Sequence, residues 1–152
     1  MVDTPRKRAE PQPNDDKAVG DGGRTDRAKP AARPILVVDD DAFVRDSLSV
    51  LLETIGFAVR SYASGSELLA GGQHGDAGCL IIDQHMPGLD GLTTLAALRR
   101  DGSDLPTILI TGRGDAEIAA RAAELGAIAV LEKPFTAARL LELARAALEQ
   151  PS

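Results

Sequence analysis

Ile35-Leu-Val-Val-Asp-Asp-Asp41 is the stretch that decides the fold, because three carboxylates follow directly on a short apolar run. The same pattern recurs at Cys79-Leu-Ile-Ile-Asp83, and polar residues close two later apolar runs at Thr111 and Lys133. A continuous apolar run of this length is typical of a parallel strand buried on both faces. Open parallel sheets build their sites at the carboxyl ends of their strands. We therefore expect carboxylates, a hydroxyl and an amine to converge at one edge of a sheet.

Strand and helix patterns alternate along the chain from Ile35 onward. This alternation predicts an α/β fold, a five-stranded parallel sheet with helices on both faces. Gly56 and Gly126 should each end a helix, and Asp115 should cap one. The expected strands are residues 35–39, 57–62, 79–83, 107–111 and 127–131, and the expected helices are residues 42–55, 64–69, 92–100, 115–125 and 135–148.

Residues 1–34 differ in composition from the rest of the chain. They hold five of the nine prolines and no aromatic residue, leucine or isoleucine. Such a segment cannot bury enough apolar surface to offset the entropy lost on ordering. We expect a disordered tail over residues 1–34 and one folded domain over residues 35–150.

Charge is distributed unevenly between these two parts. Residues 1–34 carry 8 Lys and Arg against 6 Asp and Glu, which leaves 9 against 17 for residues 35–152. An acidic folded part repels nucleic acid phosphates, so direct nucleic acid binding is not expected. No apolar stretch approaches the roughly 18 residues of a membrane span, and no apolar core follows Arg6-Lys-Arg8. We expect a cytoplasmic protein in which the lone Cys79 is a small buried filler.

Three carboxylates predict a metal site. Adjacent carboxylates are costly to ionise together unless a cation neutralises them. Asp39 and Asp40, joined by Asp83 from another strand, therefore predict bound Mg²⁺, which prefers hard oxygen ligands. Asp41 fits the cap of the following helix better than a metal site. A solvated turn is the alternative for Asp39 and Asp40, and the presence of Asp83 disfavours it.

Thr111 and Lys133 add the groups that phosphoryl chemistry needs. The Thr111 hydroxyl can donate to an oxyanion, and the Lys133 ammonium is a compact charge for a phosphoryl oxygen. A metal, two donors and a carboxylate nucleophile together suit phosphoryl transfer. These residues alone do not say which carboxylate is the nucleophile.

The polar strand ends resemble those of the receiver domains of two-component response regulators. The matching segments keep the family's order and separations: Ile35-Leu-Val-Val-Asp-Asp-Asp41, Ile82-Asp-Gln-His-Met-Pro-Gly-Leu-Asp-Gly91, Leu109-Ile-Thr-Gly112 and Leu131-Glu-Lys-Pro-Phe135. The resemblance implies a flavodoxin-like, doubly wound (β/α)5 fold with strand order 2-1-3-4-5. It implies that Asp83 is a phosphoacceptor, phosphorylated by a sensor histidine kinase or a histidine phosphotransfer protein, while Thr111 and Lys133 contact the phosphoryl oxygens. Such a chain is a signalling phosphoacceptor that assists its own phosphorylation and hydrolysis, not an enzyme.

The same resemblance implies a ligand set for Mg²⁺. Asp40 and Asp83 would bind the ion directly, Asp39 would assist through water, and the backbone carbonyl of His85 would complete the protein ligands. A side-chain role for His85 in tuning phosphoaspartate hydrolysis is the less favoured interpretation. The peptide bond between Lys133 and Pro134 is cis in such domains.

One position departs from the family's pattern. Receiver domains usually carry Tyr or Phe three residues before the lysine, where this chain has Val130. An aliphatic side chain cannot report movement of the threonine by ring rotation. We therefore expect activation to reach the face formed by the fourth helix, fifth strand and fifth helix weakly or by another route. A homodimer, if one forms, is expected through this face.

Two other functions stay open from the sequence. Asp39-x-Asp41 also resembles haloacid-dehalogenase-type phosphatases, with Asp39 as the nucleophile, although Phe43 after the motif and the lack of an acidic pair after Lys133 weigh against that hypothesis. A pseudo-receiver that binds partners without phosphorylation is disfavoured because the acidic, threonine and lysine positions are intact. We expect a single-domain regulator that acts on a downstream protein or on an output domain of another chain, and a module of a longer protein is the alternative.

Overall fold

Five parallel strands form one sheet in the order β2-β1-β3-β4-β5, which confirms the predicted fold class and strand order. The computed structural model describes residues 33–72, 74–112 and 115–150, so the predicted disordered tail falls, up to residue 32, outside the described residues. The strands are β1 Ile35–Val38, β2 Val59–Tyr62, β3 Cys79–Asp83, β4 Thr107–Thr111 and β5 Ala129–Glu132. The helices are α1 Ala42–Thr54, α2 Gly65–Ala70, α3 Gly91–Arg100, α4 Ala116–Glu124 and α5 Ala137–Leu148.

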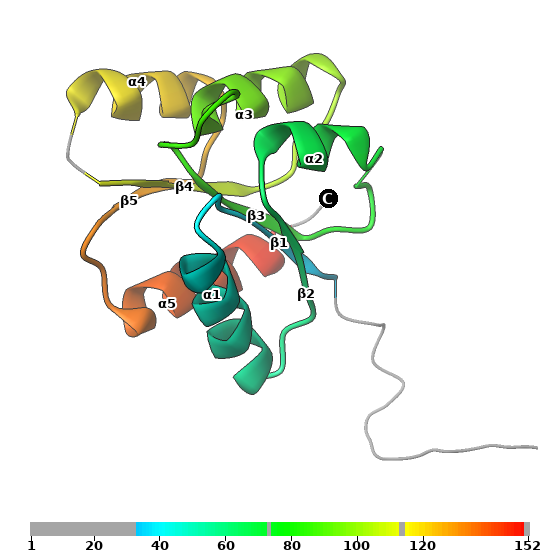
Figure 1. Cartoon of the computed structure of the whole chain (residues 1–152), viewed down its shortest axis with the longest axis vertical. Coiled ribbons are helices and arrows are strands. Elements are labelled where there is room, and N and C mark those ends of the chain that lie inside the picture. The colour runs from blue at the N-terminus through cyan, green and yellow to red at the C-terminus, as the bar shows by residue number, and fades with distance from the viewer. Residues whose placement is uncertain (1–32, 73, 113–114, 151–152) are drawn as a thin grey trace, which may run out of the picture. The chain divides into compact units, whose positions relative to one another are not determined.

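Helices cover both faces of the sheet. Figure 1 shows α1 and α5 on one side and α2, α3 and α4 on the other. Successive strand residues point to opposite faces, so Ile35 and Val37 join the cluster under α1 and α5, while Leu36 and Val38 join the cluster on the other side. The strands β1, β3 and β4 are buried along their whole length, which explains their continuous apolar sequences. In the described part of the chain, no helix has both the length and the apolar character to cross a membrane.

Side-chain caps begin the helices where the sequence predicts them. Asp41 accepts hydrogen bonds from the backbone N–H groups of Phe43 and Val44, and Asp115 does the same for the start of α4. Ser64 caps α2 by accepting from the N–H of Glu67 at 3.0 Å. Asp41 is therefore engaged as a helix cap, as expected.

The helix ends explain why two strands start later than predicted. Gly56 and Gly126 have positive φ, and each allows the next residue to bond back to the helix: Phe57 N–H donates to Leu52 O at 3.1 Å, and Ala127 N–H donates to Ala122 O at 2.9 Å. Phe57 and Ala127 thus complete helix ends instead of starting strands. The shift of β5 to Ala129–Glu132 places Lys133 directly after that strand.

Candidate functional site

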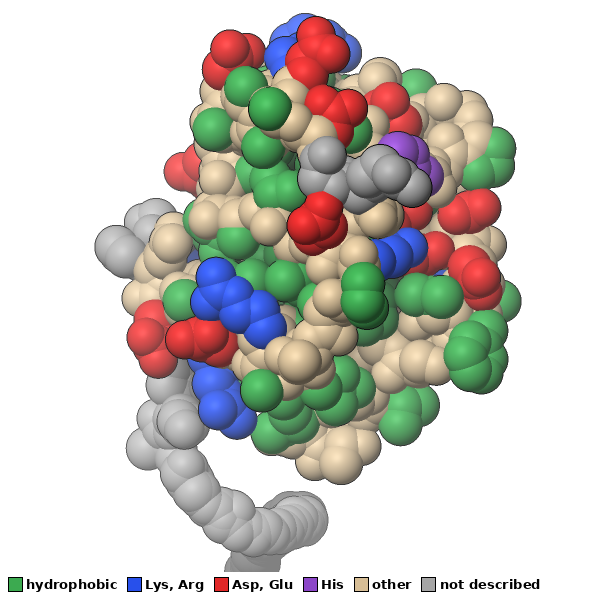
Figure 2. Space-filling view, turned by 90° about the vertical axis from the view of Figure 1, so that its left-hand side faces the viewer, with side chains coloured by type: hydrophobic (Ala, Val, Ile, Leu, Met, Phe, Trp, Pro, Cys, Tyr) green, Lys and Arg blue, Asp and Glu red, His purple; other side chains and the backbone are tan. Residues whose placement is uncertain are grey.

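The strand register brings the predicted site residues to one edge of the sheet. Val38 pairs with Ile82, so Asp39 and Asp83 occupy neighbouring strand ends, and Asp83 pairs with Ile110 beside Thr111. The backbone N–H of Lys133 donates to Thr111 O at 2.8 Å, which places Lys133 at the same edge. Figure 2 looks onto this edge, where acidic, basic and histidine side chains meet. The predicted convergence of strand-end polar groups is confirmed.

Asp39, Asp40 and Asp83 form the acidic cluster of the site. Their carboxylate oxygens lie within 4.8 Å of one another, with Asp39 and Asp83 buried and Asp40 exposed. Burial, and to a lesser extent the nearby charge of Asp83, raises the pKa of Asp39, although Asp39 accepts the N–H of Asp41 at 2.9 Å. Three carboxylates this close repel one another unless a cation lies between them.

One carboxylate oxygen of Asp83 is buried beside an ammonium group. This oxygen, Oδ1, accepts no hydrogen bond of acceptable angle from the described residues. The Lys133 ammonium lies 3.2 Å from that oxygen, and the side chains of Lys133 and Asp83 are 41% and 5% exposed. A buried carboxylate oxygen without a hydrogen bond is a suitable ligand for a hard cation or a nucleophile. The donor set therefore fits Mg²⁺.

Thr111 is buried at the end of β4 and contacts a histidine. Its Oγ1 lies 3.3 Å from Nε2 of His85, an exposed residue two positions beyond Asp83. The resemblance implied a role chiefly for the backbone carbonyl of His85, and this side-chain contact was not predicted. His85 lies beyond the end of β3, outside the strand, so no strand periodicity indicated this contact. The peptide bond between Lys133 and Pro134 is cis, as the resemblance implied.

Two residues that support the site were missed from the sequence. Arg45 on α1 donates from its guanidinium to the backbone carbonyl of Asp39 at 2.7 Å, bringing a positive charge to the acidic cluster. Gln84 is buried and fixes the loop after β3: its Oε1 accepts the N–H of Leu92 at 2.8 Å, and its Nε2 donates to Asp90 at 3.2 Å. Both contacts depend on tertiary placement, so no local sequence signal indicated them.

Gly91 lies against the end of β3. A Cβ at this position would meet Leu109 Cδ1 at 2.7 Å and the carbonyl oxygen of Asp83 at 2.8 Å. Gly91 therefore allows α3 to begin in contact with the end of β3. Gly88, by contrast, has a φ of +77°, which glycine adopts without strain.

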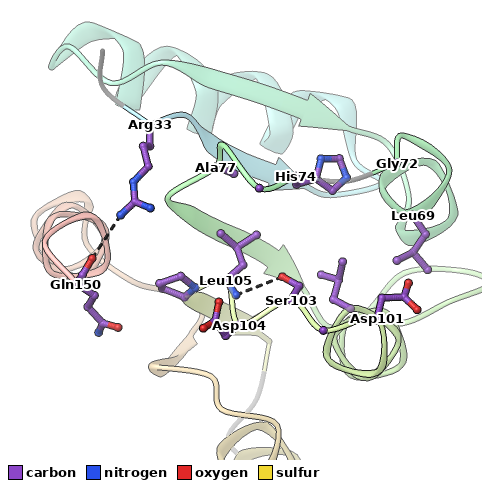
Figure 3. A pocket seen from close by; sticks show the side chains of 14 residues that line it. Arg33, Leu69, Gly72, His74, Ala77, Asp101, Ser103, Asp104, Leu105 and Gln150 are labelled. Carbon is purple, nitrogen blue, oxygen red and sulfur yellow. Dashed lines mark hydrogen bonds between the residues drawn. The ribbon is translucent and has the colours of Figure 1, made fainter. Parts of the chain in front are cut away.

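A separate cavity lies at the opposite edge of the sheet. It has a volume of about 750 Å³ and is lined at the strand starts by residues such as Arg33, Ala77 and Leu105, with none of the predicted site residues. Figure 3 shows His74 on its wall. His74 is held there by Leu68 O, 2.8 Å from its Nε2, and by an edge contact with the Tyr62 ring.

Cys79 is buried in β3, as the sequence predicts for a small apolar filler. Burial raises the pKa of its thiol to about 12.

The fold and the strand-end site agree with the family comparison. The family model of the response regulator receiver domain matches residues 35–145, and the chain belongs to this family. Phosphorylation of an aspartate is the general mechanism of such domains, and response regulators work with histidine kinases. The match does not support the haloacid-dehalogenase alternative.

Individual relatives are similar over the folded part. The transcriptional regulatory protein FixJ of Azorhizobium caulinodans is 42% identical over 119 residues, covering 78% of this chain and 56% of that protein. The C4-dicarboxylate transport transcriptional regulatory protein DctD of Rhizobium meliloti is 42% identical over 120 residues, covering 79% of this chain and 26% of that protein. The crystal structure of a response regulator receiver domain protein from Clostridium thermocellum superposes with a TM-score of 0.71 at 31% identity, covering 76% and 93% of the two chains. The chain thus spans about half or less of the length of these two curated relatives.

Proposed function

We propose that Asp83 is the phosphoacceptor of this receiver domain. The main support for this proposal is the environment of Asp83 Oδ1. This oxygen is buried, accepts no hydrogen bond from the described residues and lies 3.2 Å from the Lys133 ammonium. In the reaction, this oxygen attacks the phosphorus of a phosphohistidine. The P–N bond breaks, its electron pair leaves with the imidazole, and an acyl phosphate forms on Asp83. An ionised carboxylate has no proton to lose, so Asp83 needs no general base, and a proton on the other ring nitrogen of the phosphohistidine lets the imidazole leave as a neutral group.

The neighbouring side chains have distinct roles in this proposal. Lys133 neutralises charge on a phosphoryl oxygen, and its ion pair with Asp83 keeps the ammonium at the reacting oxygen. The Thr111 hydroxyl, at the end of the adjacent strand, donates to another phosphoryl oxygen. With these groups the domain assists its own phosphorylation and the later hydrolysis of the acyl phosphate.

Mg²⁺ is the cofactor that the acidic cluster fits. Asp40 and Asp83 would hold it directly, Asp39 would assist through water, and the His85 carbonyl would be the remaining protein ligand. When bound, the ion neutralises phosphoryl charge and relieves the repulsion among the three carboxylates. Arg45, bonded to the carbonyl of Asp39, fixes the backbone that presents this cluster.

The phosphoryl donor is proposed to be a protein, either a sensor histidine kinase or a histidine phosphotransfer protein. Phe43 and Val50 on α1 are 79% and 60% exposed. With Ser47, Leu51 and Thr54 they line an apolar groove of about 560 Å³, and Phe43 lies two residues beyond the capping Asp41. An exposed apolar surface on the helix that follows Asp39 and Asp40 fits a protein donor better than a small molecule. We place the reaction in the cytoplasm.

The output is proposed to be phosphorylation-dependent contact with a downstream protein or an output domain. The face formed by α4, β5 and α5 is the surface through which a homodimer would form. Val130 is partly buried on the α4 side of the sheet, packed with the cluster that includes Ala122 and Leu109. Position 130 carries no aromatic ring that could transmit movement of Thr111, so we expect the response of this face to be weak.

Incubation with a small phosphodonor and Mg²⁺ tests the proposal. Intact mass spectrometry should show one added phosphoryl group, which is absent with a chelator and in Asp83→Asn. Label that survives Asp83→Asn but is lost in Asp39→Asn would assign the nucleophile to Asp39 instead. No label on the wild-type protein would favour the pseudo-receiver that binds partners without phosphorylation.

A further inference from the structure

His85 joins the loop after β3 to the end of β4. The contact between His85 Nε2 and Thr111 Oγ1, at 3.3 Å, is a side-chain link between these two segments. Either the hydroxyl donates to a bare ring nitrogen or a ring N–H donates to the hydroxyl oxygen. In both cases the Thr111 side chain must face the imidazole.

The backbone on both sides of His85 is anchored. The N–H of Gln84 donates to Ile110 O at 2.7 Å, the Gln84 carbonyl accepts the N–H of Gly91 at 3.1 Å, and its side chain bonds to the start of α3. Met86, on the other side, is 7% exposed and part of the core. The exposed His85 ring is therefore presented to Thr111 from a fixed backbone, and its principal remaining freedom is its own rotamer.

We propose that His85 is a positioning residue for Thr111. It holds the hydroxyl beside the β3–α3 loop before phosphorylation and loses this contact when the hydroxyl turns to a phosphoryl oxygen on Asp83. This inference rests on the proposed function, since it needs a phosphoryl group at Asp83 to compete for Thr111.

Because position 130 is aliphatic, the contact between Thr111 and His85 is the route by which movement of the Thr111 hydroxyl would be transmitted. Val130 packs with apolar neighbours and has no ring that could exchange between two positions. The Thr111–His85 contact, in contrast, joins two segments with different partners, and it must change if the hydroxyl moves. The imidazole and the β3–α3 loop therefore report the state of Asp83 in this chain.

Beryllofluoride, which mimics the phosphoryl group, provides the test with the full chain and Mg²⁺. Removing a contact that must be broken should tighten its binding, so His85→Ala should lower the dissociation constant about fivefold, equivalent to one hydrogen bond of about 1 kcal/mol. His85→Gln, whose amide can replace the imidazole, should bind within about twofold of wild type. His74→Ala is the matched control, because it removes the histidine at the opposite edge of the sheet. It should leave the affinity unchanged.

A double-mutant cycle separates positioning of Thr111 from a general effect of losing His85. In a Thr111→Ala background, His85→Ala should no longer change the affinity. The wild-type protein gives a second readout, because the ring nitrogen resonances of His85 should shift when beryllofluoride binds. Unchanged affinity in His85→Ala, or an effect that persists without the Thr111 hydroxyl, would overturn the inference and leave Asp83 as the phosphoacceptor. Failure of the wild-type protein to bind beryllofluoride would overturn the proposed function and this inference together.

Discussion

The ammonium of Lys133 lies 3.2 Å from the Oδ1 of Asp83, although β5, which precedes Lys133, and β3, which ends at Asp83, are separated by β4. The long lysine side chain therefore crosses one strand end to reach the carboxylate. This ion pair joins the last strand to the centre of the sheet at an oxygen that accepts no hydrogen bond within residues 33–72, 74–112 and 115–150.

Replacing Lys133 should slow phosphorylation more than it affects folding. Lys133→Ala removes the charge that stabilises the transferring phosphoryl group, and the loss of one such donor typically costs about a hundredfold in rate. Lys133→Arg keeps the charge with a different shape and should be intermediate. The measurement is the rate of phosphorylation by a small phosphodonor in saturating Mg²⁺. Equal rates for the wild-type protein and Lys133→Ala would remove Lys133 from the mechanism.

Asp39→Asn should stabilise the protein in the absence of Mg²⁺. The fold raises the pKa of Asp39 above its ordinary value of 3.8, mainly through burial, so the folded state prefers the protonated acid. Its ionisation therefore lowers stability as pH rises through the folded-state pKa, and this cost is absent below the ordinary value. At pH 7 the variant should gain on the order of 1 kcal/mol, the usual size of a single-residue effect.

Urea unfolding in chelator, at pH 7 and near the ordinary pKa of aspartate, measures this difference. The gain should shrink as pH falls, because wild-type Asp39 then becomes protonated too. Added Mg²⁺ should stabilise the wild-type protein more than the variant, since the variant has lost one carboxylate of the cluster. If Asp39→Asn is less stable than wild type at pH 7, the claim that the fold disfavours ionised Asp39 is contradicted.

Truncating the exposed apolar groove on α1 should affect only transfer from a protein. Phe43→Ala and Val50→Ala should each reduce transfer from a histidine kinase by about tenfold, the typical effect of losing a central interface side chain. Phosphorylation by a small phosphodonor should be unchanged. Ile55→Ala is the control, because Ile55 is partly exposed just after the same helix but does not line the groove. Equal losses with both donors would mean that the groove acts on the site itself.

Arg99 should contribute to stability by joining the ends of two helices. Its guanidinium donates to Leu125 O at 2.6 Å and to Ser103 O at 3.1 Å, which satisfies carbonyls at the ends of α4 and α3. Burial lowers the pKa of Arg99, yet the group stays charged. Arg99→Ala should lower the free energy of unfolding by about 2 kcal/mol, as expected for hydrogen bonds from a charged group. Arg100 is exposed, so Arg100→Ala should change the free energy of unfolding by less than about 0.5 kcal/mol. Similar losses in Arg99→Ala and Arg100→Ala would refute the bridging role of Arg99.

The sequence predicted the site better than its supporting contacts. Asp39, Asp83 and Thr111 were predictable because a strand end is a local feature, and parallel strands bring such ends together. The starts of β2 and β5 were placed too early, since the backbone bonds that complete helix ends after Gly56 and Gly126 are not visible as an apolar pattern.

Side-chain contacts with nearby loops were not predictable in the same way. Arg45 and Gln84 act on backbone groups that only the tertiary structure brings near them. The partners of His74 become evident only when Leu68 and Tyr62 are placed beside it.

Locating the phosphoryl group tests the central claim most directly. After phosphorylation with a small phosphodonor and Mg²⁺, borohydride reduction converts an aspartyl phosphate to homoserine, and peptide mass spectrometry identifies the modified position. We predict homoserine at position 83, with Asp39, Asp40 and Asp41 unmodified. Homoserine at position 39, with Asp83 unmodified, would contradict the assignment of Asp83 as the phosphoacceptor.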